Sequence, residues 1–411
     1  MKKQIYDVIV IGGGAAGMLS SAAAAERGLT VLLIEKNDVC GKKLRITGKG
    51  RCNVTNNCSV REVIENLPTG GKFLYGAVSA LPPERVMAMF EDMGVPLKTE
   101  RGGRVFPVSD KASDIVNALR RRVQRAGVEL MHGRVLEILA EDGVAVGVRT
   151  GEGDIFCRNV ILCTGGASYP ATGSEGDGYV MAERLEHRIV KIRPSLVPLV
   201  ENGGDCEKMQ GLSLRNVSVS VSDGGKKPVF TGFGELLFTH FGVSGPLALS
   251  ASAHMRDFDR KKYTMSIDLK PALDEKALDA RILRDFEQQA NKDFRNSLGG
   301  LASRMMIPVL IERSKIPPET KVNSITREQR RRLLELFKSF KINILEPRPV
   351  SEGIITSGGV DLKEINPKTM ESKLVSGLYF AGEVIDADAY TGGFNLQIAW
   401  STAYAAAMHL E

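Results

Sequence analysis

The beginning of the chain alternates apolar and polar segments in the order expected of a βαβ unit. Residues 8–11 and 30–34 are runs of apolar side chains rich in branched residues, typical of buried strands. Residues 15–27 between them are rich in alanine and predict a helix. The turn into this helix reads GGGAAG, and Glu35 closes the second strand. Strand, glycine turn, helix, strand and terminal acid in this order predict a dinucleotide-binding unit.

Each glycine of the GxGxxG pattern in this turn has its own expected role. Gly12 permits the tight turn, Gly14 lets the backbone approach a pyrophosphate, and Gly17 lets the helix lie close to the sheet. The helix N-terminus adds free N–H groups and partial positive charge. Glu35 lies where a ribose hydroxyl would arrive, which favours FAD or NAD over NADP. The cofactor contacts expected here are Gly12, Gly14, Ala15, Ala16, Gly17, Glu35 and Lys36.

The pattern after this unit predicts helices and then a series of strands. Residues 82–93 and 112–126 have helical periodicity, and Ser109 and Asp110 precede the second helix in a capping position. A short strand-like connection lies between the two helices. The strands predicted in this part of the chain are residues 105–108, 128–131, 135–139, 144–149, 155–157 and 159–163.

The character of the sequence changes twice more along the chain. Residues 195–269 contain short strands and glycine-rich turns and predict an inserted β domain, whereas residues 271–340 are mainly helical and strongly charged. Sheet character then returns before a last amphipathic helix, so the first sheet is completed from the far end of the chain. The strands, turns and helix that support this division are residues 218–222, 223–225, 232–245, 265–269, 354–360, 378–381 and 394–410.

We therefore predict an α/β fold with a discontinuous nucleotide-binding domain. This domain comprises residues 1–192 and 345–411, and it is interrupted by a β-rich substrate domain and a helical subdomain. Their expected bounds are residues 193–270 and 271–344.

The segment of residues 40–57 is too rich in glycine, lysine and asparagine for a regular helix or strand, and we expect an extended loop. Its cations alternate with flexible backbone and precede amide and hydroxyl groups. Such a loop could cover a pyrophosphate or line a flavin, and an ordinary surface loop is the alternative. We expect Cys52 to be a packed thiol rather than a reactive one. The polar and flexible positions concerned are Lys42, Lys43, Lys49, Gly50, Arg51, Cys52, Asn53, Thr55 and Asn56.

Composition narrows the class of protein. With 411 residues, 43% of them hydrophobic, the chain should hold two or three globular domains. The net charge of +6 is spread among 49 acids, so we expect no nucleic-acid partner, and the arginine runs at 120–122 and 330–332 read as solvated helix faces. No apolar stretch is long enough to span a membrane, and no signal peptide is evident. Six cysteines without CxxC spacing predict reduced thiols in the cytoplasm and no zinc site.

Several blocks, in order, resemble one family. They are GGGAAG, GKKLRITGKGRCNVTNN, TGGASYPATGSEGDGY, PSLVPL, FTHFGVSGP and GLYFAGEVIDADAYTGGFNLQIAWSTAYAA. Together they span nearly the whole chain and resemble the YhiN/BaiN-like family of bacterial flavoproteins, also labelled aminoacetone-oxidase-like FAD-binding enzymes. The resemblance implies a glutathione-reductase-type FAD domain interrupted by a β-rich domain and a helical domain. Lys49 and Ala403 stand where this family commonly has glycine.

The resemblance also implies contacts from later segments to FAD. Glu383 would accept a hydrogen bond from a ribitol hydroxyl. The N-terminus of the last helix, at Gly393, would face the N1 and O2 edge of the flavin, where negative charge accumulates on reduction. Asn395 and Gln397 would continue that polar wall, and Val135 would contact adenine through its backbone. The contacts implied in this way are Val135, Thr164, Gly165, Gly166, Gly382, Glu383, Gly392, Gly393, Phe394, Asn395 and Leu396.

The catalytic groups are less well defined by the sequence. FAD would supply the hydride-accepting atom, so the protein needs to place a substrate and manage one proton. His240 lies in a glycine-rich block, Tyr169 and Tyr390 are comparable candidates for proton transfer, and Arg51 could hold a carboxylate.

Three classes of function fit these observations. The first is an FAD-dependent oxidoreductase acting on a small organic substrate, either reducing an activated C=C bond with NAD(P)H or oxidising an amine with oxygen. The others are a flavoprotein acting on tRNA and a non-catalytic flavin-binding or sensing protein. No second GxGxxG follows the first, so NAD(P)H would bind only as a transient reductant. We expect no membrane partner, and the sequence leaves the oligomeric state open.

Overall fold

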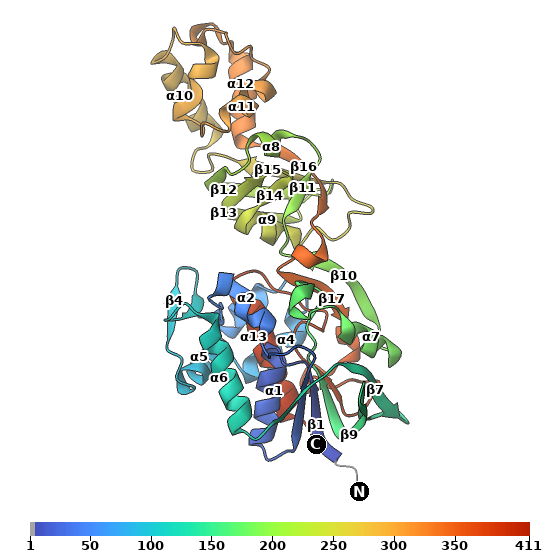
Figure 1. Ribbon diagram of the computed structural model, residues 1–411. Helices are drawn as coiled ribbons and strands as arrows, with labels where there is room; N and C mark the ends of the chain where they lie inside the picture. Colours follow the sequence, from blue (N-terminus) through green and yellow to red (C-terminus); the bar gives the residue numbers. More distant parts are fainter. Residues whose placement is uncertain (1–4) are drawn as a thin grey trace. The chain divides into compact units, whose positions relative to one another are not determined.

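The computed structural model describes residues 5–411 and divides into two compact units (Figure 1). Unit 1 comprises the chain up to Ser195 together with Val350–Glu411, and unit 2 comprises Leu196–Pro349. Each unit has its own cluster of buried hydrophobic side chains. The predicted α/β fold, with an inserted β-rich and helical part, is confirmed.

Unit 1 is built on a sheet whose central strands are parallel. The strand order is β6–β2–β1–β9–β8–β7, and β18 pairs with the second half of β9 while β8 pairs with its first half. The sheet is therefore completed from the far end of the chain. The strands are β1 (Ile5–Ile11), β2 (Val31–Glu35), β6 (Glu129–His132), β7 (Val135–Glu141), β8 (Val144–Thr150), β9 (Gly153–Leu162) and β18 (Leu378–Phe380).

The first helix, α1 (Ala15–Glu26), packs against both α6 (Ala112–Arg125) and the last helix, α13 (Phe394–Met408). The prediction of an amphipathic last helix is wrong. Eleven of the fifteen residues of α13 are buried, because α1, α4 and α5 surround it. Trp400 is fully buried there, and its Nε1 donates to the carbonyl of Val54 at 2.9 Å.

The prediction of an extended loop at residues 40–57 is also wrong in part. Lys42–Gly50 forms α2, which kinks at Thr47 and carries left-handed residues at Gly48 and Lys49, and Thr55–Asn56 forms β3. The helix α6 begins after Lys111 without a side-chain cap, because Asp110, the expected cap, bonds with Arg51 and Lys98 instead. The neighbouring elements are α3 (Val60–Glu65), α4 (Gly71–Ala80), α5 (Pro83–Asp92), β4 (Leu97–Glu100) and β5 (Arg104–Pro107).

The chain leaves and re-enters unit 1 through a pair of antiparallel strands, β10 (Ile189–Ser195) and β17 (Ile355–Val360). Helix α7 (Asp177–Arg184) packs on both of them and on β7. The boundaries of unit 1 therefore lie close to the ends of this strand pair, a few residues beyond the expected positions 192 and 345.

Unit 2 is a closed barrel with helices attached. The barrel strands follow the order β11–β14–β13–β12–β15–β16. Residues 232–245, predicted as a turn cluster, lie mostly in β13 and β14, where glycines permit close strand approach: a Cβ on Gly242 would lie 2.2 Å from the carbonyl oxygen of Leu199. The strands are β11 (Leu199–Glu201), β12 (Ser213–Ser222), β13 (Phe230–Thr239), β14 (Gly242–Ser244), β15 (Tyr263–Asp268) and β16 (Phe340–Pro347).

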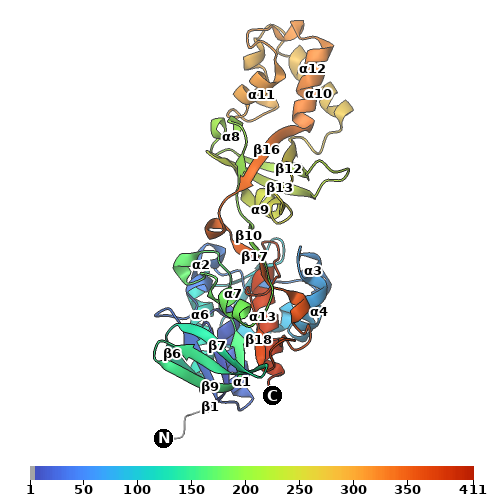
Figure 2. The same cartoon turned by 90° about the vertical axis from the view of Figure 1, so that its right-hand side faces the viewer.

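The helical part of unit 2 shares one hydrophobic cluster with the barrel. Figure 2 shows α10, α11 and α12 grouped at one end of the barrel strands. The chain returns from them along β16, which completes the barrel and crosses the expected domain boundary at residue 344. The helices of unit 2 are α8 (Asp205–Lys208), α9 (Gly245–Ser252), α10 (Glu275–Glu287), α11 (Ile307–Ser314) and α12 (Arg327–Lys338).

Among residues 5–411, no helix has the length and apolar character needed to cross a membrane. Within the same residues, no group of His, Cys, Asp and Glu side chains could hold a metal ion. All six cysteines are free thiols. Cys52 is completely buried, and this burial raises the pKa of its thiol to about 12. Such a thiol stays protonated near neutral pH, in line with its expected packing role.

Candidate functional site

Four parallel strands of unit 1 end at the same edge of the sheet. Ile11 at the end of β1 lies beside Ile34 in β2 and Leu162 in β9, and Phe380 at the end of β18 lies beside Leu162. Ligands of open α/β sheets bind outside the carboxyl ends of such strands. This edge brings together the predicted cofactor residues of the glycine turn, the end of β2, residues 164–166 and residues 382–383.

The glycine turn has the geometry of a dinucleotide cradle. A Cβ on Gly12 would lie 2.6 Å from the carbonyl oxygen of Cys163, and one on Gly17 would lie 1.8 Å from the carbonyl oxygen of Gly12. By contrast, a Cβ on Gly14 would meet no atom within 4 Å. Gly12 and Gly17 are thus required for packing. Gly14 leaves open space at the N-terminus of α1, where Ala15 and Ala16 begin the helix and free N–H groups could face an anion.

Glu35 is held beneath this turn. Its Oε2 accepts from the backbone N–H of Gly13 at 2.7 Å, and its Oε1 accepts from the backbone and side-chain nitrogens of Asn37 at 2.8 and 2.7 Å. A carboxylate offers about four lone-pair sites. Three are in use, so Glu35 can accept from one further hydroxyl without losing a bond.

A polar cluster on the same edge joins four segments of the chain. Lys43 donates to Ser168 Oγ and to Glu383 Oε2, each at 2.7 Å. Glu383 Oε1 accepts from Ser168 Oγ at 3.1 Å and from the backbone N–H of Thr356 at 2.9 Å. The hydroxyl of Thr356 in turn accepts from the N–H groups of Ala167 and Ser168. We call Lys43, Ser168, Thr356 and Glu383 the Glu383 cluster.

The other predicted cations of the site have protein partners or point to solvent. Lys36 forms ion pairs with Glu175 and Asp177, at 2.9 and 2.6 Å. Lys42 is exposed. Arg51 bonds with Glu100 and Asp110, at 2.5 and 2.6 Å, and stacks on Phe106. Because two carboxylates already neutralise Arg51, the structure does not leave this side chain free to hold a substrate carboxylate.

Several predicted contacts lie around these groups. Asn53 Oδ1 and Thr164 Oγ1 are buried without a hydrogen-bond partner among the described residues. The Asn53 oxygen could accept from a ligand, and the Thr164 hydroxyl could accept or donate. Gly50 has a positive φ of 83° and open space on its Cα, and Val135 is buried at the start of β7.

The N-terminus of α13 is constrained by packing. Gly393 has φ of 100°, and a Cβ there would lie 2.3 Å from the carbonyl group of Thr55. No acidic side chain caps the first turn of α13, so its N–H groups can face an anion. The two amides expected to form a polar wall bond within the protein instead. Asn395 bonds with the backbone of Ala389, and Gln397 is buried against Thr55, Leu81 and Ser401. The remaining predicted positions of this turn are Gly392, Phe394 and Leu396.

The candidate acid–base residues are divided between the two units. Tyr169 directly follows Ser168 of the Glu383 cluster, is 37% exposed and has φ of 55°. A positive φ is uncommon for tyrosine and is frequent at functional sites. His240 belongs to unit 2, in the exposed turn between β13 and β14, with its ring edge-on to Phe241. Tyr390 is partly buried, and its N–H donates to the carbonyl of Asn66.

Sequence analysis did not identify Asn37, Ser168 or Thr356. Each is a small polar residue within a few positions of a strand terminus, and this is the signal that could have identified them. Asn37 also donates to the carbonyl of Thr172, which ties the end of β2 to the loop after β9.

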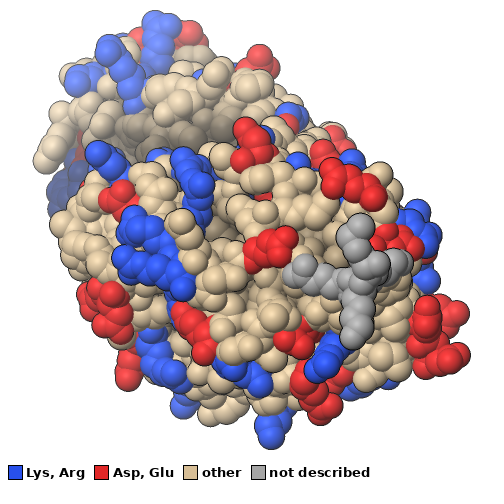
Figure 3. Space-filling view, turned by 60° about the horizontal axis from the view of Figure 1, so that its bottom comes forward, with Lys and Arg blue, Asp and Glu red and all other residues tan. Residues whose placement is uncertain are grey.

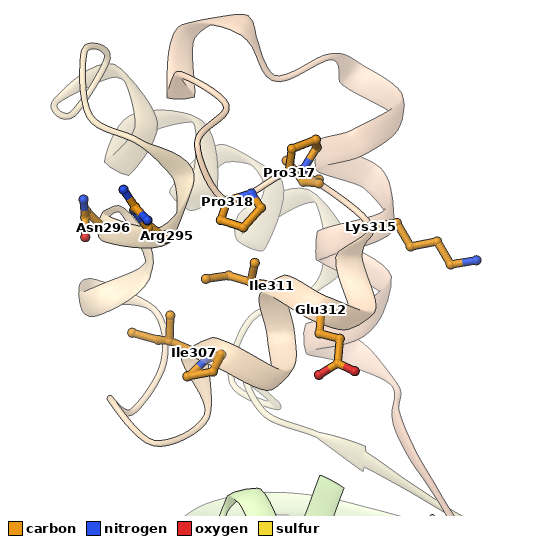
Figure 4. A pocket seen from close by; sticks show the side chains of 10 residues that line it. Arg295, Asn296, Ile307, Ile311, Glu312, Lys315, Pro317 and Pro318 are labelled. Atoms are coloured by element: carbon orange, nitrogen blue, oxygen red, sulfur yellow. The ribbon is translucent and has the colours of Figure 1, made fainter. Parts of the chain in front are cut away.

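A cavity of about 740 Å³ lies in the helical part of unit 2. Figure 4 shows Ile311 and Pro318 facing each other across it, whereas Glu312 and Lys315 point away. Its lining is mainly isoleucine and proline, with Arg295 and Asn296 at one side. It lacks the glycine turn and converging polar groups of the sheet edge, so the sheet edge is the better candidate for cofactor chemistry.

Comparison with known proteins identifies relatives along the whole chain. A family described as HI0933-like protein Rossmann domain matches residues 6–409. A 3-dehydro-bile acid delta(4,6)-reductase of Clostridium scindens is 27% identical over 92% of this chain and 91% of its own. A ribosomal RNA dihydrouridine synthase of Escherichia coli is 30% identical over 98% of both chains. Among solved structures, a 3-ketosteroid delta1-dehydrogenase of Sterolibacterium denitrificans has a TM-score of 0.54 at 14% identity, covering 99% of both chains. This last likeness concerns the fold alone.

Proposed function

This chain belongs to the family of HI0933-like Rossmann-domain proteins, and from that premise we propose that it reduces carbon–carbon double bonds conjugated to a carbonyl group. The family membership confirms the resemblance carried by the sequence blocks. With the fold, it makes the chain a flavin-dependent oxidoreductase. The direction of the reaction and the type of bond are our proposal.

One observation carries the choice of reaction. Two relatives match this chain almost from end to end, and the activities for which they are named share a chemical step. A delta(4,6)-reductase and a dihydrouridine synthase both saturate a C=C bond that is conjugated to a carbonyl. In such a reduction the carbon β to the carbonyl receives a hydride and the α carbon receives a proton. Amine oxidation, the alternative left open by the sequence, has no counterpart in these two names.

The residues at the sheet edge fit FAD in two groups. Gly14 and the N-terminus of α1 would hold the pyrophosphate, and Glu35 would accept from one ribose hydroxyl. The Glu383 cluster and the N-terminus of α13 would hold the part of the cofactor that carries the flavin. When bound and reduced, FAD supplies the hydride. Because the sequence has no second GxGxxG, we propose NAD(P)H as a transient reductant.

Tyr169 is our candidate for the proton donor. It is exposed, it lies next to the Glu383 cluster in sequence, and its backbone is held in a conformation that tyrosine rarely adopts. A phenol can donate a proton to the α carbon while the developing negative charge lies on the carbonyl oxygen. His240 remains a second candidate from unit 2.

Anaerobic half-reactions test this proposal. The purified holoprotein would be reduced with NADH or NADPH and then mixed with a cyclic enone, with an amine control and with oxygen. We expect the enone to reoxidise the flavin faster than oxygen does and to be recovered with its double bond saturated. Tyr169→Phe should slow reoxidation by the enone without slowing reduction, whereas Tyr75→Phe, an exposed tyrosine on α4, should change neither. Reduction of the flavin by amines, with reoxidation only by oxygen, would contradict the proposal.

Uridine in RNA is a second candidate substrate for the same reaction. The whole net charge of +6 lies in unit 2, which has 25 Lys and Arg against 19 Asp and Glu. Positive charge of this kind favours nucleic acid, contrary to our expectation of no nucleic-acid partner. Mixing the reduced protein with uridine-containing RNA and assaying dihydrouridine separates the two substrates. Reoxidation by RNA but not by the enone would assign RNA as the substrate.

A further inference from the structure

Unit 1 also contains a cavity, which lies far from the sheet edge that carries the glycine turn. It has a volume of about 550 Å³ and lies among α1, α5, α6 and α13. Glu26, at its rim, is the last residue of α1, whose other end begins at the glycine turn. A helix rises 1.5 Å per residue, so about 18 Å separate the two ends of this twelve-residue helix. A ligand in this cavity is therefore too distant to exchange a hydride with a flavin at the strand ends.

The cavity is lined by more cations than anions. Its charged residues are Arg85, Arg121, Arg122 and Arg125, against Glu26 and Asp92. Arg122 binds both carboxylate oxygens of Glu26, at 2.8 and 2.7 Å. The remaining Nη1 of Arg122 is buried and has no hydrogen-bond partner among the described residues. An unpaired buried guanidinium N–H is costly, so an anionic acceptor that reached Nη1 would stabilise it.

Arg121 and Arg125 extend this excess of positive charge. They are four residues apart on α6, so they lie on one face of the helix, and both are exposed. Figure 3 looks onto the end of unit 1 that is lowest in Figure 1. It shows Lys and Arg side chains gathered on the left, the side on which α5 and α6 lie. We call the cavity with its four arginines the arginine cavity.

The rest of the lining is apolar and contains one aromatic ring. The guanidinium of Arg85 lies 5.5 Å from the centre of the Tyr404 ring. Ligand sites typically combine an apolar wall with a few polar groups that fix orientation. Guanidinium groups bind phosphate oxygens through paired hydrogen bonds. The apolar lining comprises Leu81, Ala88, Met89, Met93, Ala118 and Ala126.

We propose that the arginine cavity binds a phosphate ester. Arg121, Arg122 and Arg125 hold the phosphate, and the attached ring system lies against the apolar wall near Met89 and Tyr404. The phosphate belongs either to a free nucleotide or to the backbone of a nucleic acid, because both present the same group to the arginines. The proposal does not depend on the reaction proposed above, because the cavity lies at the opposite end of α1.

Binding to the FAD-loaded protein tests the proposal. Calorimetric titrations would use inorganic phosphate, AMP, adenosine and a short single-stranded RNA, with flavin absorbance recorded to show that FAD is retained. AMP should bind more tightly than phosphate or adenosine alone, because only AMP supplies both the anion and the ring. If the source is nucleic acid, RNA should bind at least tenfold more tightly than AMP.

Matched variants locate the binding. Arg121→Gln with Arg125→Gln should weaken AMP or RNA at least tenfold, and both side chains are exposed, so the fold should be kept. Arg120→Gln is the control, because Arg120 is exposed on the same helix but does not line the cavity. The proposal is overturned if neither AMP nor RNA binds, if the double variant binds as the wild type does, or if Arg120→Gln weakens binding equally.

Discussion

The two units differ in how the chain builds them and in the charge they carry. Unit 1 is assembled from two separate segments, and unit 2 is one continuous stretch. Of the 55 Lys and Arg and 49 Asp and Glu in the chain, unit 2 has 25 and 19, which leaves 30 of each in unit 1. Unit 1 is therefore neutral overall, and unit 2 carries the formal charge of +6. A unit without net charge, such as unit 1, can hold one dianionic cofactor through the groups that contact it. A unit whose positive charge is spread over it, such as unit 2, attracts larger anions.

The sheets of the two units also differ in a way that concerns function. The parallel strands of the unit 1 sheet end at one edge, where the N-terminus of α1 and the Glu383 cluster converge. The antiparallel barrel of unit 2 closes on itself and has no such edge. We propose from this difference that cofactor chemistry belongs to unit 1.

The largest effect should come from two glycines of the same turn in unit 1. Gly17→Ala places a Cβ 1.8 Å from the carbonyl oxygen of Gly12, so it should destabilise unit 1 by at least about 3 kcal/mol even without FAD. Gly14→Ala meets no protein atom within 4 Å and should leave the stability of the apoprotein unchanged while weakening FAD. Urea unfolding of both apoproteins, followed by FAD titration, measures the two effects. Equal destabilisation by both variants would contradict this account of the turn.

This contrast shows what the sequence could and could not predict. The glycine turn and strands β1 and β2 are local, so one stretch of sequence defined them. The Glu383 cluster is not local, because its bonds join Ser168 and Thr356, which are 188 positions apart. Helix α2 was missed because it is short and ends in left-handed residues at Gly48 and Lys49.

The prediction that two amides form a polar wall at the start of α13 failed for a related reason. Asn395 has the type of side chain that often contacts a ligand, but its amide bonds with the backbone of Ala389, six residues away. The sequence displays a polar side chain without displaying its partner. Which donors and acceptors remain available therefore depends on packing, and packing is visible only in the structure.

Removing FAD should affect one unit and spare the other. A ligand present at about a hundred times its Kd stabilises the fold that binds it by about 2.7 kcal/mol. For a unit of this size the midpoint temperature of unit 1 should fall by roughly 5 to 10 °C in the apoprotein. The single tryptophan, Trp400, lies in unit 1, so its fluorescence follows that unit, while circular dichroism follows both. A fall of equal size in a separate transition of unit 2 would show that the cofactor does not belong to unit 1 alone.

Glu35 should contribute to both cofactor binding and the shape of the turn. Hydrogen bonds to charged groups are worth about 1.5 to 3 kcal/mol, so Glu35→Ala should weaken FAD roughly ten- to a hundredfold. Because Glu35 also accepts from the N–H of Gly13 and from Asn37, apoprotein stability should fall as well. Asn37→Ala is the comparison, since it removes only one donor to Glu35. Unchanged FAD affinity in Glu35→Ala would remove this carboxylate from the site.

The smallest expected effect is a pH dependence confined to unit 1. His187 is buried, its Nε2 bonds with Ser372 Oγ at 2.8 Å, and its ring packs edge-on against Phe380 at the end of β18. Burial lowers the pKa of His187 below its ordinary value of 6.5, although Glu364 acts in the opposite direction. On unfolding, the histidine then takes up a proton whenever the pH is below about 6.5. The stability of unit 1 is fully present above that pH and is lost as the pH falls.

Because β18 leads into Gly382 and Glu383, this loss should also loosen the sheet edge that holds the cofactor. We expect the urea midpoint followed by Trp400 to fall between pH 7.5 and 5.5, and FAD release to become easier over the same range. His187→Gln cannot take up a proton and should reduce the pH dependence, whereas His240→Gln, in an exposed turn of unit 2, should not. If His240→Gln instead removed the pH dependence of unit 1, stability at the sheet edge would depend on the other unit. The proposal that the cofactor site belongs to unit 1 alone would then be wrong.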